Sequence, residues 1–357
     1  MKLKLILQVF GLITVILTLL PILDFDYWFI RVLDFPHVQL TCLTLASALL
    51  FFIRFNRKKF FDYFFLITLF ACFVFQLYKI LPYTPLSKTQ LFEAKSSSKD
   101  AINLFTANVL QKNKNAEKIK KLIPEIDADI MVLTETNTRW LNDLKSVTRK
   151  YAFKFEIPLP NSYGMLLYSK YELIAPEVRY LVDDSIPSIH TKLRLPNNDI
   201  VQLFAIHPTP PVPKENTYSS DRDAELMMVA ELAKNSRIPV IVLGDLNDVA
   251  WSETSSLFKK ISGLLDARIG RGFYNTYSAE SFILRWPLDH IFVSKEFRYK
   301  DMRVCRSIDS DHFPLFMSLI YKPELAEEQR QKPATAAEIK NANQQIEDFK
   351  NSIKKIK

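Results

Sequence analysis

Six short motifs contain the residue types that phosphate-ester hydrolysis uses. Four follow short apolar runs: Asn108 after residues 101–106, Glu135 after 129–134, His207 after 201–206, and Gly244-Asp245-Leu246-Asn247 after 238–243. Two acid–histidine pairs come later in the chain, Asp289-His290 and Asp311-His312. That hydrolysis requires a cation on the phosphoryl oxygens, a water activated in line with the leaving group, and help for the leaving oxygen. Carboxylates, amides and imidazoles could supply all three.

The elements that position these residues can be inferred from hydrophobic patterning. Short runs rich in Val, Ile, Leu and Phe predict buried strands. In α/β sheets, ligand sites gather at the carboxyl ends of the strands, so we expect the polar residues to meet in one pocket. Helices are predicted over residues 115–123, ending at Pro124, and from about Ser220–Asp223 onwards.

A divalent cation and a tuned histidine are the two chemical groups that this set suggests. Mg²⁺ prefers carboxylate and amide oxygens and keeps several waters, so one or two carboxylates can hold it. Glu135 and Asn108 meet that need. A histidine held by an aspartate is a tuned acid or base, and His312 with Asp289 would form such a pair if the fold brings them together.

Each motif alone has a structural alternative. A Gly-Asp-x-Asn sequence is more often a turn than a site, and Glu135 could be an exposed strand end. The joint occurrence of all six in order favours a site. We expect Asp129 to be structural, and His37 and His190 to lie outside the site. Strand alternation would turn His290 away from the side on which Asp289 points.

The order of these motifs resembles the endonuclease/exonuclease/phosphatase superfamily. The resemblance covers residues 100–321 and rests on the following motifs: Asn108 after a strand, 127–135 ending in Glu135, Ile206-His207-Pro208, Gly244-Asp245-Leu246-Asn247, Leu288-Asp289-His290-Ile291 and Ser310-Asp311-His312-Phe313-Pro314. The proline-rich sequence His207–Pro211 and the apolar segments that precede the motifs are most similar to the bacterial membrane-anchored branch.

The resemblance implies an α/β fold, a four-layered sandwich of two packed mixed sheets like that of deoxyribonuclease. It also implies a divalent metal, Mg²⁺ or Mn²⁺, at Glu135 with help from Asn108. Asp311 would lie at this metal or at a second metal position. One departure concerns the first strand, where some abasic-site enzymes have an Asp two residues after the Asn. Leu110 stands at that position here, so a second carboxylate is absent.

The resemblance also implies roles for the remaining residues. Asp245 would orient or deprotonate the water, and Asn247 would contact the phosphate. His312, oriented by Asp289, would bind or protonate a phosphoryl oxygen. His207 would act near the leaving group. Which acid is the general base stays open.

Residues 3–23, 38–54 and 61–80 are long and apolar, close to the roughly 20 residues that a membrane-spanning helix needs. They predict three transmembrane helices, the middle one short. A cleaved signal peptide is the alternative for the first, but no small-residue cleavage site follows it. We therefore predict a membrane anchor over 1–84, a linker over 85–99, a catalytic domain over 100–321 and a charged tail, helical or disordered, over 322–357.

The basic residues around these segments predict the orientation. Lys2 and Lys4 precede the first segment, and four basic residues lie within 54–59. Because cytoplasmic loops are enriched in Lys and Arg, the amino terminus and the 54–59 loop should be cytoplasmic. Three spans then place the catalytic domain on the extracytoplasmic side of an inner or plasma membrane.

Charge narrows the possible partners only a little. The chain of 357 residues has a net charge of +8. Residues 1–84 hold 8 of the 47 Lys and Arg and 4 of the 39 Asp and Glu, which leaves 39 against 35, or +4, for the remainder. That value is not by itself the footprint of a nucleic-acid-binding domain. Cys305 is the only cysteine after residue 84, so no disulfide is expected there.

These observations predict a membrane-anchored, metal-dependent phosphoesterase that cleaves a phosphodiester or phosphomonoester by in-line attack of water. The substrate stays open among a lipid head group, a nucleotide and a nucleic acid. One alternative is a nuclease acting on extracytoplasmic DNA or RNA. The other is a catalytically idle, membrane-anchored binding module, which would predict loss of Glu135, Asp245 or His312. The lipid bilayer is an expected partner, and the sequence indicates no protein partner.

Overall fold

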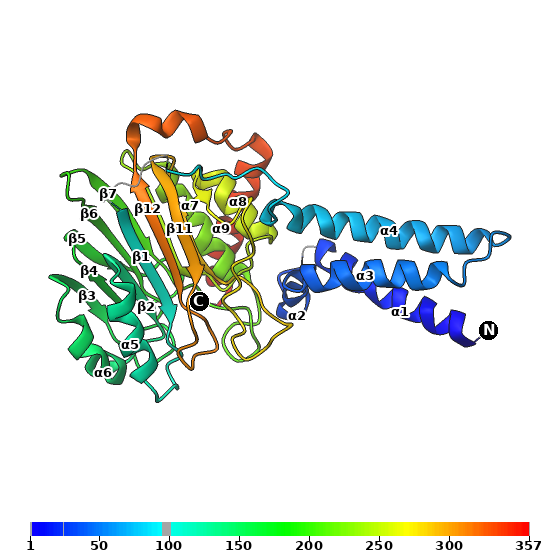
Figure 1. Cartoon of the computed structure of the whole chain (residues 1–357), viewed down its shortest axis with the longest axis horizontal. Helices are drawn as coiled ribbons and strands as arrows, with labels where there is room; N and C mark the ends of the chain where they lie inside the picture. Colours follow the sequence, from blue (N-terminus) through cyan, green and yellow to red (C-terminus); the bar gives the residue numbers. More distant parts are fainter. Residues whose placement is uncertain (1, 24, 95–100, 357) are drawn as a thin grey trace.

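Two six-stranded sheets pack face to face in the computed structural model, which describes residues 2–23, 25–94 and 101–356 (Figure 1). The first sheet has the order β11-β12-β1-β2-β4-β3. Its strands are β1 (Ala101–Asn108), β2 (Ile130–Thr134), β3 (Phe153–Ile157), β4 (Met165–Ser169), β11 (Phe297–Val304) and β12 (Leu315–Tyr321). Strands β1 and β2 are parallel, and the other pairs are antiparallel, so the sheet is mixed.

The second sheet has the order β5-β6-β7-β8-β10-β9. Its strands are β5 (Glu172–Arg179), β6 (Ser188–Arg194), β7 (Ile200–Ala205), β8 (Val240–Asp245), β9 (Leu265–Asp266) and β10 (Asp289–Val293). Only β7 and β8 are parallel. Each sheet therefore has one parallel pair, β1 with β2 or β7 with β8. An antiparallel strand, β12 or β10, lies next to that pair and begins at the edge where the pair ends.

Helices cover the outer face of each sheet. Helices α5 (Glu117–Ile126) and α6 (Thr138–Thr148) cover the first sheet, and α7 (Ser220–Lys234), α8 (Glu253–Ser262) and α9 (Ala336–Ile356) cover the second. Apolar residues of both inner faces, such as Val132 and Leu243, form the central core. This confirms the predicted four-layered sandwich. Helix α5 continues two residues past Pro124, where we had expected it to end, and closes at Asp127 in the left-handed conformation.

Three apolar helices extend away from the sheets at one side of the molecule (Figure 1). The segment comprises α1 (Lys2–Leu19), η1 (Leu20–Leu23), α2 (Trp28–Arg31), η2 (Val32–Asp34), α3 (His37–Phe52), α4 (Phe60–Ile80) and η3 (Leu81–Tyr83). Within the described residues, Lys2–Leu23 and Phe60–Tyr83 are each long and apolar enough to cross a membrane. Helix α3 reaches that length only together with Trp28–Asp34, from which it bends by 75°.

The stretch expected to be a linker contacts the domain through much of its length. Phe92 N donates to Gln329 Oε1 at 2.8 Å, and Ala94 N donates to Tyr299 O at 2.8 Å. Residues 95–99 lie outside the part of the chain that the structure describes. The tail forms η4 (Pro323–Gln329) and α9, which buries Ala342 and Ile346 against α7.

Candidate active site

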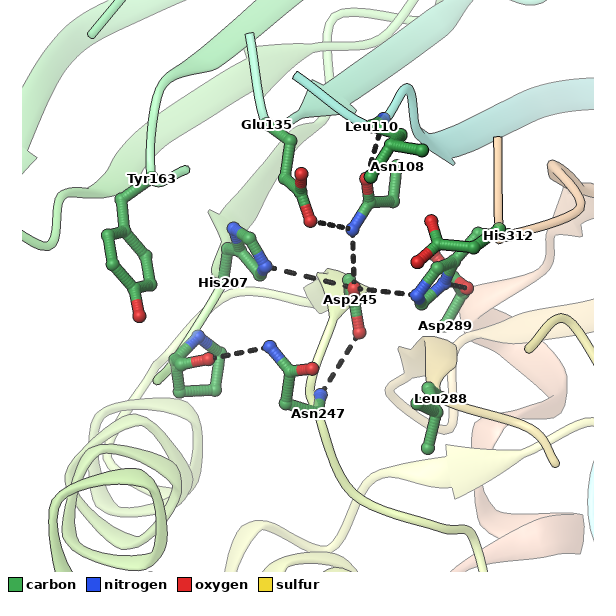
Figure 2. Close-up of polar contacts among 12 residues, drawn as sticks. Asn108, Leu110, Glu135, Tyr163, His207, Asp245, Asn247, Leu288, Asp289 and His312 are labelled. Carbon is green, nitrogen blue, oxygen red and sulfur yellow. Dashed lines mark hydrogen bonds and ion pairs between the residues drawn. The ribbon is translucent and has the colours of Figure 1, made fainter. Parts of the chain in front are cut away.

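The polar residues at the strand ends meet at one edge of the two sheets (Figure 2). Asn108 ends β1, Glu135 follows β2, His207 follows β7, and Asp245 ends β8. The antiparallel strands supply the rest, because β10 begins with Asp289, whose register partner is Asp245, and Asp311 and His312 precede β12. The predicted convergence of the carboxyl ends of the strands thus extends to the beginnings of two antiparallel strands.

Two carboxylates flank the His312 imidazole. His312 Nδ1 lies 2.8 Å from Asp289 Oδ2, and His312 Nε2 lies 3.5 Å from Asp245 Oδ2. All three side chains are buried. Thr276 Oγ1 accepts the Asp289 backbone N–H at 3.1 Å, which fixes the start of β10. This Asp–His–Asp arrangement fixes the imidazole and leaves its Nε2 facing the centre of the site.

Electrostatics make His312 a cation at neutral pH. Burial alone would lower the pKa of this imidazole, but the Asp245 and Asp289 carboxylates outweigh burial and raise the pKa to about 10. A protonated Nε2 can donate a hydrogen bond to a phosphoryl oxygen or a proton to a leaving oxygen. Asp245, Asp289 and His312 are close enough together to hold a metal ion. However, His312 Nδ1 and Asp289 Oδ2 are hydrogen-bonded to each other, so these two atoms orient the imidazole instead of binding a metal.

Asn108 lies between the carboxylates of the two sheets. Its Nδ2 donates to Glu135 Oε1 at 2.8 Å and to Asp245 Oδ2 at 2.9 Å, while its Oδ1 accepts Leu110 N at 2.9 Å. Gln111 N donates to Glu135 Oε2 at 3.1 Å. Glu135 has a φ of 58°, a left-handed conformation that costs a residue with a Cβ roughly 1–2 kcal/mol. Strain of this kind is concentrated at functional sites, where it aims a side chain.

His207 and Asn247 lie on the other side of Asp245. His207 Nε2 is 3.7 Å from Asp245 Oδ2. Asn247 N donates to Asp245 Oδ1 at 3.1 Å, and Asn247 Nδ2 donates to Pro208 O at 2.9 Å. Asp311 is half-buried beside this group; burial raises its pKa most, His312 opposes the shift and Glu135 adds to it. The structure therefore brings all eight predicted site residues together.

A cavity of about 240 Å³, here called the active-site pocket, opens over this group. Its lining consists of Val32, Phe35, Asn108, Glu135, Ser162, His207, Pro210, Pro211, Val212, Glu215, Asp245, Asn247, Tyr277, Leu288, Asp311 and His312. Four of these are carboxylates, and none of the described lining residues is Lys or Arg. Four carboxylates with a single protonated histidine and no Lys or Arg in the described lining leave an excess of oxygen donors, which fits a hard divalent cation.

Several residues in or beside the pocket were not predicted from the sequence. The Tyr163 ring lies 5.5 Å from His207, and the Tyr277 ring lies 4.9 Å from His312. No motif marks either tyrosine. Val32 and Phe35 come from the apolar helical segment, for which the sequence predicts only the role of a membrane anchor. A long-range contact of this kind has no local sequence signal.

Other buried polar residues have structural roles. His190 is buried beside Phe204, and His290 Nε2 lies 2.8 Å from Asp248 O, on the side of β10 away from the pocket, as predicted. Arg222 is buried and donates to Asn247 O at 2.9 Å, so it supports the loop that carries Asn247. It contacts the site from behind and does not line the pocket.

The fold and the grouping of acid, amide and imidazole side chains at one sheet edge define a class of α/β phosphoesterases. Residues 105–312 match the profile of the Endonuclease/Exonuclease/phosphatase family, and the chain belongs to this family. Members of the family are hydrolases that act on phosphoesters. No match was found among curated proteins.

Solved structures share the fold at low sequence identity. TDP2 of D. rerio complexed with single strand DNA product is 14% identical, with a TM-score of 0.53 over 62% of this chain and 100% of that one. The endonuclease/exonuclease/phosphatase from Bacteroides vulgatus is 17% identical, with a TM-score of 0.53 over 63% and 100%. The human Nocturnin catalytic domain with bound sulfate anion is 17% identical, with a TM-score of 0.50 over 64% and 97%.

Proposed function

We propose that this chain is a membrane-anchored, divalent-metal-dependent phosphoesterase that hydrolyses a phosphodiester or phosphomonoester by in-line attack of water. The domain of residues 100–321 would carry the reaction on the extracytoplasmic side, and the apolar helical segment would be its anchor. The observation that carries the proposal is the alignment of Asp245, His312 and Asp289 beside Asn108 and Glu135 in one pocket.

Glu135 is the proposed metal ligand, with Asn108 and Asp311 beside it. Glu135 lies among oxygen donors and has no Lys or Arg partner among the described residues, which supports this assignment. A bound Mg²⁺ or Mn²⁺ would neutralise charge that develops on the phosphoryl oxygens. Removing Glu135 should therefore impair metal binding and turnover together.

The other side chains divide the remaining work according to their surroundings. Asp245, an acceptor-only carboxylate between two imidazoles, is placed to orient a water and take its proton. The protonated His312 is placed to donate to a phosphoryl oxygen, and Asp289 holds its orientation. Asn247 and His207 flank Asp245, where they can contact the phosphate and the leaving group.

The pocket lining favours a small or lipid phosphoester over a long nucleic acid. Protein–nucleic acid affinity depends strongly on Lys and Arg that neutralise successive phosphates. The described residues that line the pocket include neither type. A nuclease therefore remains the second candidate, and its test is hydrolysis of plasmid DNA and single strands at physiological salt.

A substrate panel with the full chain in detergent micelles tests the proposal. The panel contains bis(p-nitrophenyl) phosphate, p-nitrophenyl phosphate, plasmid DNA, a single-stranded oligonucleotide and phospholipid in mixed micelles. We expect turnover with Mg²⁺ or Mn²⁺ that a chelator stops and that Asp245→Asn lowers by on the order of 10²-fold. The variant Glu172→Gln changes a half-exposed carboxylate whose partner Arg194 is on the surface, and it should match the wild type. Failure on every substrate with both metals would favour the idle binding module.

A further inference from the structure

The apolar helical segment forms part of the active-site pocket. Val32 and Phe35, which lie between α1 and α3, line the pocket together with Asp245 and His312. Pro210, Pro211 and Leu288 continue the same apolar wall. The pocket thus has a polar floor made by the sheets and an apolar wall to which the segment contributes.

Backbone and side-chain contacts fix this wall in place. Trp28 N donates to Thr217 O at 2.9 Å, and Trp251 Nε1 donates to Asp34 O at 2.9 Å. The Phe35 ring packs edge-on against Trp286 at 5.6 Å between centroids. The helical segment is therefore a built part of the pocket rather than a tether beside it.

The wall lies at the depth where the apolar helices end. Figure 1 shows α1, α3 and α4 running side by side away from the sheets, with α2 at their domain end. Helix α3 begins there, at His37, two residues after Phe35. If these helices cross a bilayer, Val32 and Phe35 lie at the boundary between hydrocarbon and water on the domain side.

An exposed apolar loop lies at the same depth. Phe282 and Ile283 are 93% and 75% exposed, and Leu284 is also exposed. Gln39 Nε2, in the first turn of α3, donates to Ile283 O at 2.6 Å, which places this loop beside the start of that helix. Large apolar side chains exposed together mark a surface that something apolar covers, and the neighbouring membrane helix indicates lipid. We call Phe282–Leu284 the apolar rim.

We propose that the substrate is a phosphoester lipid of the bilayer that holds the chain. Its phosphate would enter the polar floor, while its acyl part would stay in the membrane along Val32, Phe35 and the apolar rim. A pocket of about 240 Å³ is smaller than typical sites that enclose a drug-sized ligand, so it accommodates the head-group phosphate and leaves the chains outside. This inference rests on the proposed phosphoesterase function.

Reconstitution of the full chain tests the inference. The vesicles contain equal parts of phosphatidylethanolamine and phosphatidylglycerol with Mg²⁺ or Mn²⁺, and hydrolysis of both lipids is measured beside that of bis(p-nitrophenyl) phosphate. Lipid should be cleaved in the vesicles that hold the protein, and not in separate protein-free vesicles. Equal cleavage in both populations would overturn the inference.

The two proposals fail in different ways. Turnover of the water-soluble diester without cleavage of either lipid would overturn the lipid inference and leave the phosphoesterase standing. Absence of turnover on all three substrates would overturn both. In the substrate panel described above, cleavage of plasmid DNA or of the oligonucleotide in preference to phospholipid would also contradict a lipid substrate.

The apolar rim supplies a variant that leaves the pocket floor intact. Phe282→Ser with Ile283→Ser should lower the ratio of lipid to soluble-diester turnover by about tenfold, because two large apolar side chains lose their lipid contact. Tyr180→Ser removes an exposed aromatic residue directly after β5, an edge strand far from the helices in Figure 1, and should leave that ratio unchanged. An unchanged ratio in the rim variant would contradict the proposal.

A second measurement does not depend on turnover. A phospholipid that carries a photoactivatable group in its acyl chain should cross-link, in these vesicles, to the peptides that contain Val32, Phe35 or the apolar rim. Prior incubation with the non-reactive lipid should reduce the yield. Cross-links confined to α1, α3 and α4 would show that lipid does not reach the pocket wall.

Discussion

A buried imidazole between two carboxylates carries its charge through neutral pH, and His312 is in that position. Its hydrogen bond to Asp289 is made inside the protein, so the aspartate acts through the histidine rather than on the substrate. We predict that Asp289→Asn lowers kcat by about 10²-fold. His312→Ala should cost at least as much, and the double variant little more, because residues that act as a unit are not additive.

The control for these variants is Asp309→Asn. Asp309 is exposed, bonds to Asn115, and has a φ of 64°, which asparagine tolerates well. Its kcat should equal that of the wild type. Independent and additive losses in Asp289→Asn and His312→Ala would contradict the prediction that the two residues act as a unit.

Glu135 should report on the metal separately from the chemistry. Glu135→Gln keeps the size of the side chain but removes its charge. We expect affinity for Mn²⁺, measured by isothermal titration calorimetry on the full chain, to fall by about tenfold or more. Asp289→Asn should bind Mn²⁺ nearly as well as the wild type. Unchanged binding in Glu135→Gln would move the metal site elsewhere in the pocket.

Glu225 on α7 offers a stability test far from the reaction. Its carboxylate is buried, and its two oxygens have no hydrogen-bond partner among the described residues. Burial, with a smaller contribution from Asp221, raises its pKa from 4.5 to about 8. The folded state therefore holds a proton that the unfolded state loses above pH 4.5, so stability falls as pH rises from about 4.5 through 8.

Glu225→Gln should remove that dependence. The variant should be more stable than the wild type at pH 9, by up to about 5 kcal/mol, and similar to it near pH 4.5. Thermal unfolding at several pH values measures the difference, with Glu231→Gln on the same helix as the matched control. A difference that is constant with pH would rule out the titration of Glu225 as its cause.

At the scale of elements, the end of β8 decides where Asp245 lies. Gly244 has a φ of +143°, and a Cβ added there would lie 2.0 Å from Ile206 O. Gly244→Ala should therefore separate β7 from β8, destabilise the fold by about 3 kcal/mol and displace Asp245. Gly263→Ala is the control, because its φ is +71° but no atom of the other described residues lies within 4 Å of the added Cβ.

Gly263→Ala should cost only about 1 kcal/mol, the penalty of the left-handed conformation alone. Denaturant unfolding and turnover of the soluble diester measure both variants. Equal losses of stability and turnover in the two variants would show that the close approach of Ile206 O is not the reason that a glycine is required at position 244.

The strands were predictable because their buried runs are continuous, and the fold puts their polar ends on one edge. Asn108, Glu135, His207 and Asp245 were found in this way, and Asp289 and His312 from their motifs. Tyr277 and Thr276 were not, because they lie in a long connection between β9 and β10 without a periodic pattern. Their positions depend on contacts with Trp286 and Asp289 that only the folded chain brings about.

Residues 85–94 illustrate the same limit. Their polar composition indicates a linker, but polar side chains can also supply partners for backbone groups of the domain. Gln90 Oε1 accepts Asp266 N at 2.9 Å, and Gln90 Nε2 donates to Gln331 Oε1 at 3.0 Å. Composition describes how a segment interacts with water, not which distant polar group replaces that water.

At the scale of the whole molecule, the proposed topology has a direct test. Alkaline phosphatase fused after Gln90 should be active in a bacterium, and β-galactosidase fused there inactive, because three crossings put that position outside the cytoplasm. Fusions after Asn56, in the loop between α3 and α4, should give the reverse pattern. The same reporter active at both positions would mean that the number of crossings between them is even.

The helical segment and the domain share a hydrophobic cluster that includes Tyr83, Val249, Trp251 and Leu288. We expect a chain cut to residues 85–357 to expose this cluster and to have a lower Tm than the full chain in detergent. A hydrophobic dye should bind the shortened chain more strongly at a temperature where both remain folded. Identical Tm and dye binding would show that the shared cluster contributes nothing to stability.

Two hydrogen bonds tie the residues after α4 to the domain. Gly270 N donates to Pro82 O at 2.8 Å, and Lys259 Nζ lies 2.5 Å from Tyr83 Oη, so these contacts favour one position of the domain relative to that helix. With α4 in a bilayer, the pocket would therefore lie at a fixed distance from the bilayer surface. The distance of a phosphoester bond from the bilayer surface would then decide whether it reaches the pocket, before any side chain contacts it. Two phosphates on one lipid, one beside the glycerol and one farther out, would be told apart by height alone.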